Sequence, residues 1–182
     1  QVPRFFMGQT PVTIAQWRVV VGYEPVDRDL DMKTSGNDDL PIQGVSWYEA
    51  TEFCKRLSRR FRNDDLTPIT PVYWLPSEAE WEYACRAETA TAYHFGDTFV
   101  QDLANCGSGK LTPVKQYPAN QWGLYDMHGN VWEWCQDHWH ENYDKAPTDG
   151  SAWIEDGDSS RRVLRGGSWC NYPGYCRSAS RD

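Results

Sequence analysis

The sequence has an excess of acidic residues and no long apolar run. Its 182 residues hold 18 Lys and Arg against 26 Asp and Glu, which gives a formal net charge of −8. A protein that contacts phosphates needs a basic face, so this balance argues against nucleic acid as the main partner. No stretch is long and apolar enough to span a bilayer, which argues against a membrane partner. The first ten residues also lack the charged region and apolar run of a signal peptide.

The cysteines include no CxxC pair, which argues against a structural zinc site. Two of them, Cys54 and Cys85, fall at core-facing positions of expected helices, where a free cysteine behaves as a small hydrophobe. An even count permits disulfides, but this placement favours a reducing compartment, and we expect a cytoplasmic location. The six are Cys54, Cys85, Cys106, Cys135, Cys170 and Cys176.

Histidine is scarce as well, with four residues in the chain. His138 and His140 would lie on one face of an extended segment, and His128 is not far away in sequence. No further ligand of suitable spacing accompanies them. Hydrogen-bonded or partly exposed histidines are therefore favoured over a zinc or iron site.

Aromatic residues are abundant instead: they make up 14% of the chain and include ten Trp. A core built on Trp and Tyr needs hydrogen-bond partners for its indole N–H and phenol O–H groups. We therefore expect a loop-rich fold crossed by buried hydrogen bonds. The length suits one domain over residues 1–182 with a sizeable core.

Three segments begin with the same helix-start signature. TIAQ at 13–16, SWYE at 46–49 and SEAE at 77–80 each fit a capping box, in which a hydroxyl accepts from an amide while Glu or Gln reaches back. Helical spacing follows each signature, and the first helix should stop at Gly22. The positions expected to face the core are Ile14, Trp17, Val21, Trp47, Ala50, Phe53, Cys54, Leu57, Trp81, Ala84 and Cys85.

The rest of the chain predicts loops and short strands. Residues 23–41 are acidic and turn-rich, and residues 62–71 form a second expected loop before a strand candidate, VYWLP at 72–76. From Thr89 onward Gly, Pro and Asn recur every few residues, so strands there can only be short. The pattern predicts an α+β fold, with helices early and strands and ordered loops late.

Several long motifs occur in a specific order. They are GQTPVT, GVSWYEATEFCKRLS, YWLPSEAEWEYACRA, PANQWGLYDMHGNVWEWCQDHW, RVLRGGSW and RSASR. Together they resemble the formylglycine-generating enzyme family, also called the sulfatase-modifying-factor family, over nearly the whole chain. The resemblance implies a variant of the C-type lectin fold with two or three helices. Two departures are a loop at 103–114 that is shorter than usual and the lack of a Gly-Phe-Arg strand after residue 182.

The resemblance also implies a calcium ion on the segment LYDMHGNVWEW. By position, its ligands would be the side chains of Asp126 and Glu133 and the carbonyls of Gly129 and Val131. Calcium takes six to eight oxygens, so this turn would supply four of them. The alternative is that the two carboxylates cap backbone amides of a Gly-Asn turn. A second family calcium site uses the loop near Asn105, where the shortened loop offers few carboxylates.

The terminal cysteines allow an enzymatic interpretation. Family enzymes oxidise a substrate cysteine with two cysteines that bind copper(I) and are separated by four residues. Here Cys170 and Cys176 are separated by five. That change moves a thiol by about 3.3 Å in an extended segment, too far for a two-coordinate metal site. The sequence therefore predicts no copper and no catalytic pair. A disulfide between these two is also disfavoured, because the loop is short.

A binding surface is the remaining interpretation. The segment resembles the variable proteins of diversity-generating retroelements, in which adenine-directed mutagenesis of Asn codons rewrites positions after RGGSW. Every interchangeable position here can be reached from an Asn codon by changing its first two bases. Tyr with small polar residues is also the composition of paratopes. With Trp169, the expected ligand-binding residues are Cys170, Asn171, Tyr172, Gly174, Tyr175, Ser180 and Asp182.

A fixed frame would carry this surface. Within it, Gly166 and Gly167 permit a close backbone approach, and Cys176 is a small packed residue. The arginines at 165, 177 and 181 either pair with carboxylates, with Glu133 and Asp137 as candidates, or stay solvated.

We therefore predict noncatalytic recognition of a protein or other ligand. The alternatives are an ordinary surface turn and a thiol-oxidising oxidoreductase of the same family.

Overall fold

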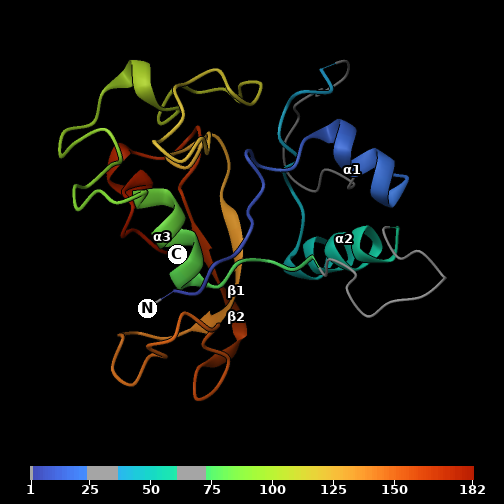
Figure 1. The fold of residues 1–182 in the computed structure, drawn as a ribbon. Helices are drawn as coiled ribbons and strands as arrows, with labels where there is room; N and C mark the ends of the chain where they lie inside the picture. The colour runs from blue at the N-terminus through green and yellow to red at the C-terminus, as the bar shows by residue number, and fades with distance from the viewer. Residues whose placement is uncertain (1, 24–36, 61–72) are drawn as a thin grey trace.

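The computed structural model describes residues 2–23, 37–60 and 73–182. Helices come first and the strands come late, as the sequence predicts (Figure 1). The elements are α1 (Ile14–Val21), α2 (Trp47–Arg60), α3 (Glu78–Arg86), the 3-10 helix η1 (Gln101–Leu103), β1 (Glu133–Trp139), β2 (Asp158–Arg165) and the 3-10 helix η2 (Pro173–Cys176). Among the described residues, no helix has the length and apolar character needed to cross a membrane.

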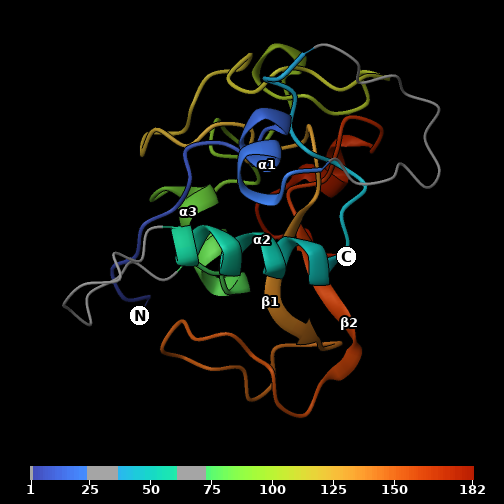
Figure 2. The ribbon, with the colours of Figure 1, turned by 90° about the vertical axis from the view of Figure 1, so that its right-hand side faces the viewer.

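The two strands form an antiparallel ribbon at the centre of the molecule. Glu133 lies opposite Arg165, and the register is irregular between Trp134 and His138. The last residues of the chain return beside β2, where Leu164 and Asp182 exchange two backbone hydrogen bonds. Helices α1 and α2 lie on one side of the ribbon and α3 on the other (Figures 1 and 2).

The three helix starts are confirmed. The hydroxyls of Thr13 and Ser77 accept from the amides of Gln16 and Glu80, and those side chains reach back to the cap. Ser46 and Glu49 make the same reciprocal pair before α2. Helix α1 ends as predicted at Gly22, which takes a left-handed conformation with φ +89°.

Helix α2 is less buried than its pattern predicts. Only Phe53 is buried, where it stacks on Trp17 at 5.3 Å between ring centroids. The predicted core positions Trp47, Ala50, Cys54 and Leu57 are half-buried. The physical reason is that α2 packs mainly against α1 in a small satellite cluster, which covers only a narrow stripe of the helix.

The main core lies between α3 and the ribbon. Trp81, Ala84 and Cys85 of α3 are buried there, as predicted. Indole groups donate hydrogen bonds that join the ribbon to the start of α2 and the residues before it: Trp47 to the Cys135 carbonyl at 2.9 Å and Trp134 to the Val45 carbonyl at 3.0 Å. These two bonds are partly buried. Fully buried bonds from Asn105 to Asn130 at 3.0 Å and from Asn120 to the Ala84 carbonyl at 2.8 Å confirm the expectation of a fold crossed by buried hydrogen bonds.

The strand candidate at 72–76 is wrong for the residues that are described. Residues 73–76 form no strand. The segment instead crosses β1 with one backbone hydrogen bond, from the Gln136 amide to the Pro76 carbonyl at 2.9 Å. Aromatic residues favour a strand locally, but a ladder needs a partner edge in register, which depends on tertiary structure. The predicted loops at 24–36 and 62–71 lie outside the described residues.

Candidate functional site

The candidate surface begins where β2 ends. Gly166 and Gly167 there have φ of +94° and +72°, which favour glycine. A Cβ on Gly167 would lie 2.6 Å from the Cys176 sulfur, and one on Gly166 would lie 3.2 Å from the Trp81 ring. The two glycines therefore permit the close approach predicted for them, and they turn the chain toward η2.

The structure places all eight predicted ligand-binding residues within reach of solvent. Tyr172 is 80% exposed and Tyr175 is 48% exposed. Cys170, Gly174 and Asp182 are also exposed, whereas Trp169, Asn171 and Ser180 are half-buried. Their role as ligand contacts stays a prediction.

Backbone hydrogen bonds fix the segment to distant loops. The Trp169 amide donates to the Asn130 carbonyl at 3.0 Å, and the Ser178 amide to the Ala92 carbonyl at 2.8 Å. The Tyr93 hydroxyl donates to the Pro173 carbonyl at 2.8 Å. The exposed side chains are thus carried by an ordered backbone.

Cys176 forms a disulfide with Cys106 from the loop after η1. The two cysteines are 70 residues apart in sequence, and their Cα atoms are 6.9 Å apart. The prediction that Cys176 packs in the frame is confirmed, since it is fully buried. The sequence did not predict its bond to Cys106, because proximity across 70 residues cannot be read from local spacing. Cys170 is free and exposed, so Cys170 and Cys176 are not a pair.

The arginine partners differ from those predicted. Arg165 is fully buried and pairs with Glu82 at 2.5 Å and Glu78 at 3.6 Å, and Arg181 pairs with Glu78 at 3.1 Å. Both carboxylates come from α3, which packs against the ribbon. Arg177 is exposed and, among the described residues, donates only to the Gly174 carbonyl at 3.0 Å. For Arg177, the solvated alternative is therefore the correct one.

The predicted partners Glu133 and Asp137 have other roles. The Trp81 indole donates to Glu133 at 3.2 Å. Asp137 accepts from the backbone amides of Glu78 at 2.7 Å and Trp153 at 2.8 Å.

Sequence reasoning missed Ser178 and the two α3 carboxylates. Ser178 is fully buried, and its carbonyl accepts from Arg165 at 2.7 Å. Glu78 and Glu82 are one helical turn apart, so they share a face of α3. Two glutamates at this spacing, in a chain whose arginines need carboxylate partners, are the sequence feature that could have indicated these ion pairs.

The turn at 126–133 meets the requirements of a cation site in part. Burial raises the pKa of Asp126, and it raises the pKa of Glu133 to about 7. One carboxylate oxygen of Glu133 is buried and has no hydrogen-bond partner among the residues that the structure describes. A cation would supply that partner, so the residues fit calcium. Among the described residues, no three His, Cys, Asp or Glu side chains converge on a metal position, so backbone oxygens and water would have to complete the shell.

Asp126 also accepts a backbone amide, but that amide lies outside the Gly-Asn turn named by the alternative. It accepts from the Lys115 amide at 3.0 Å and from the Asn130 side chain at 3.5 Å. The second family site does not fit this chain. The Asn105 amide group donates to Lys110 and Asn130, and its oxygen accepts from Ser108. Asn105 thus closes its own loop with protein partners.

The rings of His128 and His140 are held by hydrogen bonds. His128 donates to the Cys176 carbonyl at 2.7 Å and accepts from the His94 amide at 3.0 Å. Burial lowers the pKa of His128 to about 4, which keeps the ring neutral near pH 7. Both ring nitrogens of His140 contact backbone carbonyls, those of His138 and Glu155.

Comparisons with known proteins agree with this geometry. A family model for the sulfatase-modifying factor enzyme 1-like domain matches residues 1–182. The formylglycine-generating enzyme of Streptomyces coelicolor is 32% identical over 160 residues, covering 78% of this chain and 46% of the enzyme. The serine/threonine-protein kinase pkn1 of Chlamydia caviae is 37% identical over 143 residues, covering 78% of this chain and 21% of the kinase. The chain therefore spans about a fifth of that kinase and less than half of that enzyme.

Among solved structures, the Treponema denticola variable protein 1 superposes with a TM-score of 0.75 and 29% sequence identity. The match covers 96% of this chain and 77% of that protein.

Proposed function

Because the chain belongs to the sulfatase-modifying factor enzyme 1-like family and has its α+β C-type lectin-like fold, we propose that it is a noncatalytic ligand-binding domain. Residues 169–182 form its binding surface, and the ligand is a protein. One observation carries the proposal: exposed Tyr172 and Tyr175 directly precede buried Cys176 and Ser178 on an anchored backbone.

The composition of the surface supports protein recognition. Tyrosine offers a large contact area with few rotatable bonds, and small polar neighbours adapt their hydrogen bonds to the ligand. Tyr172 and Tyr175 flank Gly174, and Asn171 lies just before them. Similarity to the Treponema denticola variable protein 1 supports the same function, with interchangeable residues on a constant frame.

The state of the cysteines weighs against thiol oxidation. A two-thiolate copper(I) site needs two free thiols that face each other. Cys176 is buried and bonded to Cys106, and Cys170 alone is free and exposed on this segment. Similarity to the Streptomyces enzyme keeps the oxidoreductase as the second candidate.

The DNA beside the gene tests the proposal. We expect a reverse-transcriptase gene and a second copy of the sequence encoding residues 165–182, which differs from the first only at adenines. Absence of both from the flanking DNA would reject diversification of this surface.

Copper(I) titration tests the second candidate. We expect no stoichiometric binding by the native protein, measured with a chromophoric copper(I) chelator as competitor. Binding of one copper per chain that disappears in both Cys170→Ser and Cys176→Ser would reject the noncatalytic proposal. Substitution of the distant, half-buried Cys54 by Ser is the control.

A further inference from the structure

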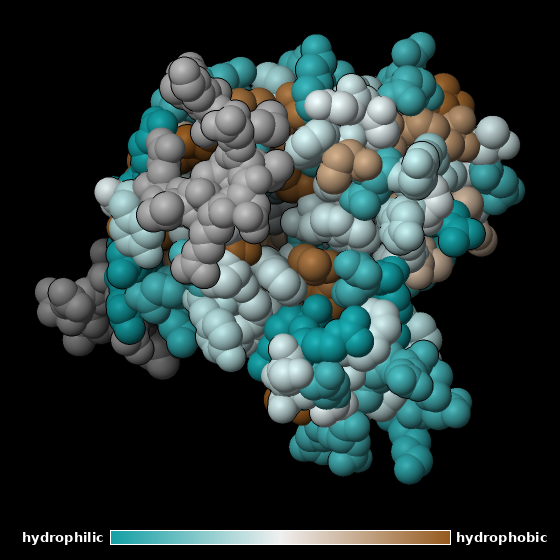
Figure 3. Space-filling model, turned by 180° about the vertical axis from the view of Figure 1, so that it is seen from behind, coloured by the Kyte–Doolittle hydropathy of each residue, from teal (hydrophilic) through white to brown (hydrophobic). Residues whose placement is uncertain are grey.

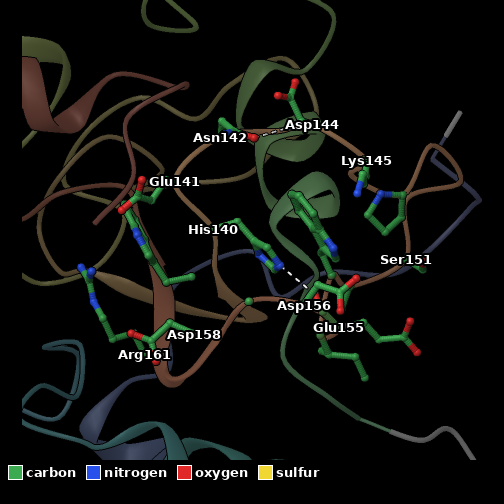
Figure 4. A pocket seen from close by; sticks show the side chains of 16 residues that line it. His140, Glu141, Asn142, Asp144, Lys145, Ser151, Glu155, Asp156, Asp158 and Arg161 are labelled. Carbon is green, nitrogen blue, oxygen red and sulfur yellow. Dashed lines mark hydrogen bonds between the residues drawn. The ribbon is translucent and has the colours of Figure 1, made fainter.

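The loops that join β1 to β2 enclose a hollow that the proposed function does not use. The hollow, here called the ribbon-end hollow, is lined by side chains from residues 139–161 and has a volume of about 1080 Å³ (Figure 4). The loops that line it lie at the far end of the ribbon from η2 (Figures 1 and 2). Its volume lies just above the range of about 300–1,000 Å³ that is usual for small-ligand sites, so it has room for a larger ligand.

One wall of the hollow is a fixed aromatic pair. The His140 ring stacks on the Trp153 indole with 3.5 Å between centroids and 8° between planes. His140 contacts the Glu155 carbonyl at 2.8 Å, and the Trp153 amide donates to Asp137 at 2.8 Å. These bonds position the rings before any ligand arrives, which lowers the entropic cost of binding.

The second wall already holds cations on an aromatic face. The Arg161 guanidinium lies 4.6 Å from the Trp139 ring centroid, and the Arg181 guanidinium lies 4.4 Å from it. Indole attracts cations through the negative electrostatic potential of its ring face. Trp139 thus shows that the aromatic surface at this end of the molecule suits guanidinium groups.

Carboxylates outnumber cations in the lining. Five acidic residues face two cationic ones, Lys145 and Arg161. Within the described part of the chain, the side chains of Glu141, Glu155 and Asp156 make no hydrogen bond or ion pair. Figure 3 shows that this end of the molecule is predominantly hydrophilic. The five acidic residues are Glu141, Asp144, Glu155, Asp156 and Asp158.

The carboxylates are spread around the hollow and do not converge on one point. Among the described residues, no three acidic, His or Cys side chains are close enough to share a metal ion. Spread carboxylates beside aromatic faces match a ligand whose positive charges are also spread, such as successive lysine or arginine side chains. We propose that the ribbon-end hollow binds a lysine- or arginine-bearing segment of a protein partner.

Binding of a hexalysine peptide at physiological ionic strength tests this site, measured by isothermal titration calorimetry. The double variant Glu155→Gln, Asp156→Asn removes two of the carboxylates without a partner. Asparagine tolerates the positive φ of +58° at position 156, so the loop should keep its shape. We expect the double variant to bind the peptide about tenfold more weakly, the loss of two charge-assisted contacts.

The matched control is Glu88→Gln, Asp102→Asn, which changes the net charge equally at exposed positions outside the lining. We expect this control to bind hexalysine as the native protein does. Equal weakening in both variants would show attraction to the overall negative charge and would overturn the site. Absence of hexalysine binding by the native protein would also overturn the site. Tighter binding of spermine than of hexalysine would overturn the choice of a peptide as the ligand. Tyr172→Ala should leave hexalysine binding unchanged, which separates this site from the proposed surface.

Discussion

At the scale of single residues, Arg165 ties the candidate surface to the core. Its guanidinium is fully buried over the Trp81 ring, 5.2 Å from the centroid. It donates to the Ser178 and Ser180 carbonyls at 2.7 Å and pairs with Glu82. One side chain thus pairs with a glutamate of α3 and also donates hydrogen bonds to the backbone of the surface segment.

Arg165→Ala should therefore destabilise the fold strongly. The substitution removes the ion pairs to Glu78 and Glu82, although each glutamate keeps another arginine. It also leaves the buried Ser178 carbonyl without its donor, and an unsatisfied buried group costs about 1–3 kcal/mol. Urea unfolding should show a loss of this size, with an unchanged slope if the native fold persists. Arg177→Ala is the control, because Arg177 is exposed, and its effect should stay within about 0.5 kcal/mol. Similar losses in both variants would contradict this account of the frame.

At the scale of elements, the turn between Leu124 and β1 concentrates buried polar groups. Asp126 and Asn130 have φ of +59° and +64°, and Asn130 is fully buried. The Asn130 side chain bonds to Asn105 and Thr112, so the turn is joined to the 103–114 loop at two positions. A cation at Asp126 and Glu133 would strengthen the same junction.

Calcium should accordingly raise the melting temperature of the native protein. A ligand that binds only the folded state at a hundred times its dissociation constant adds about 2.7 kcal/mol of stability. Differential scanning calorimetry with added calcium, and then with a chelator, measures the shift and its reversal. Glu133→Gln should abolish it, while Glu88→Gln should not. If calcium leaves the melting temperature of the native protein unchanged, the prediction is wrong and hydrogen bonds alone hold the turn.

At the scale of the whole molecule, the Cys106–Cys176 disulfide joins the loop after η1 to the binding segment. The two cysteines are 70 residues apart, and the loop that the bond closes contains the entire ribbon. Cross-linking a long loop lowers the entropy of the unfolded chain. Disulfides persist mainly in oxidising compartments. The redox state of this pair in the native protein therefore tests the predicted cytoplasmic location.

Cys106→Ser should destabilise the native protein by about 2–4 kcal/mol through this loss of constraint. Thermal unfolding of the variant measures the change, and the free, exposed Cys170→Ser is the control with little expected effect. Peptide mapping without reductant should recover a fragment that links residues 106 and 176. Recovery of both cysteines as free thiols from protein purified under air would contradict the bond.

The sequence by itself determined the local features of the fold. Capping boxes and helical spacing fixed the starts of all three helices, because these signals act over a few residues. The ordered motifs identified the family and its α+β C-type lectin-like fold. The same local reading predicted that Tyr172 and Tyr175 would reach solvent, and the structure exposes both.

Only the tertiary structure decided which distant groups meet. It paired Cys176 with Cys106, gave Arg165 and Arg181 their partners on α3, and left most of α2 half-buried. It also formed the ribbon-end hollow from loops without any sequence motif. The physical reason is the same in each case: these contacts depend on how elements far apart in the chain pack together, and local spacing carries no record of that packing.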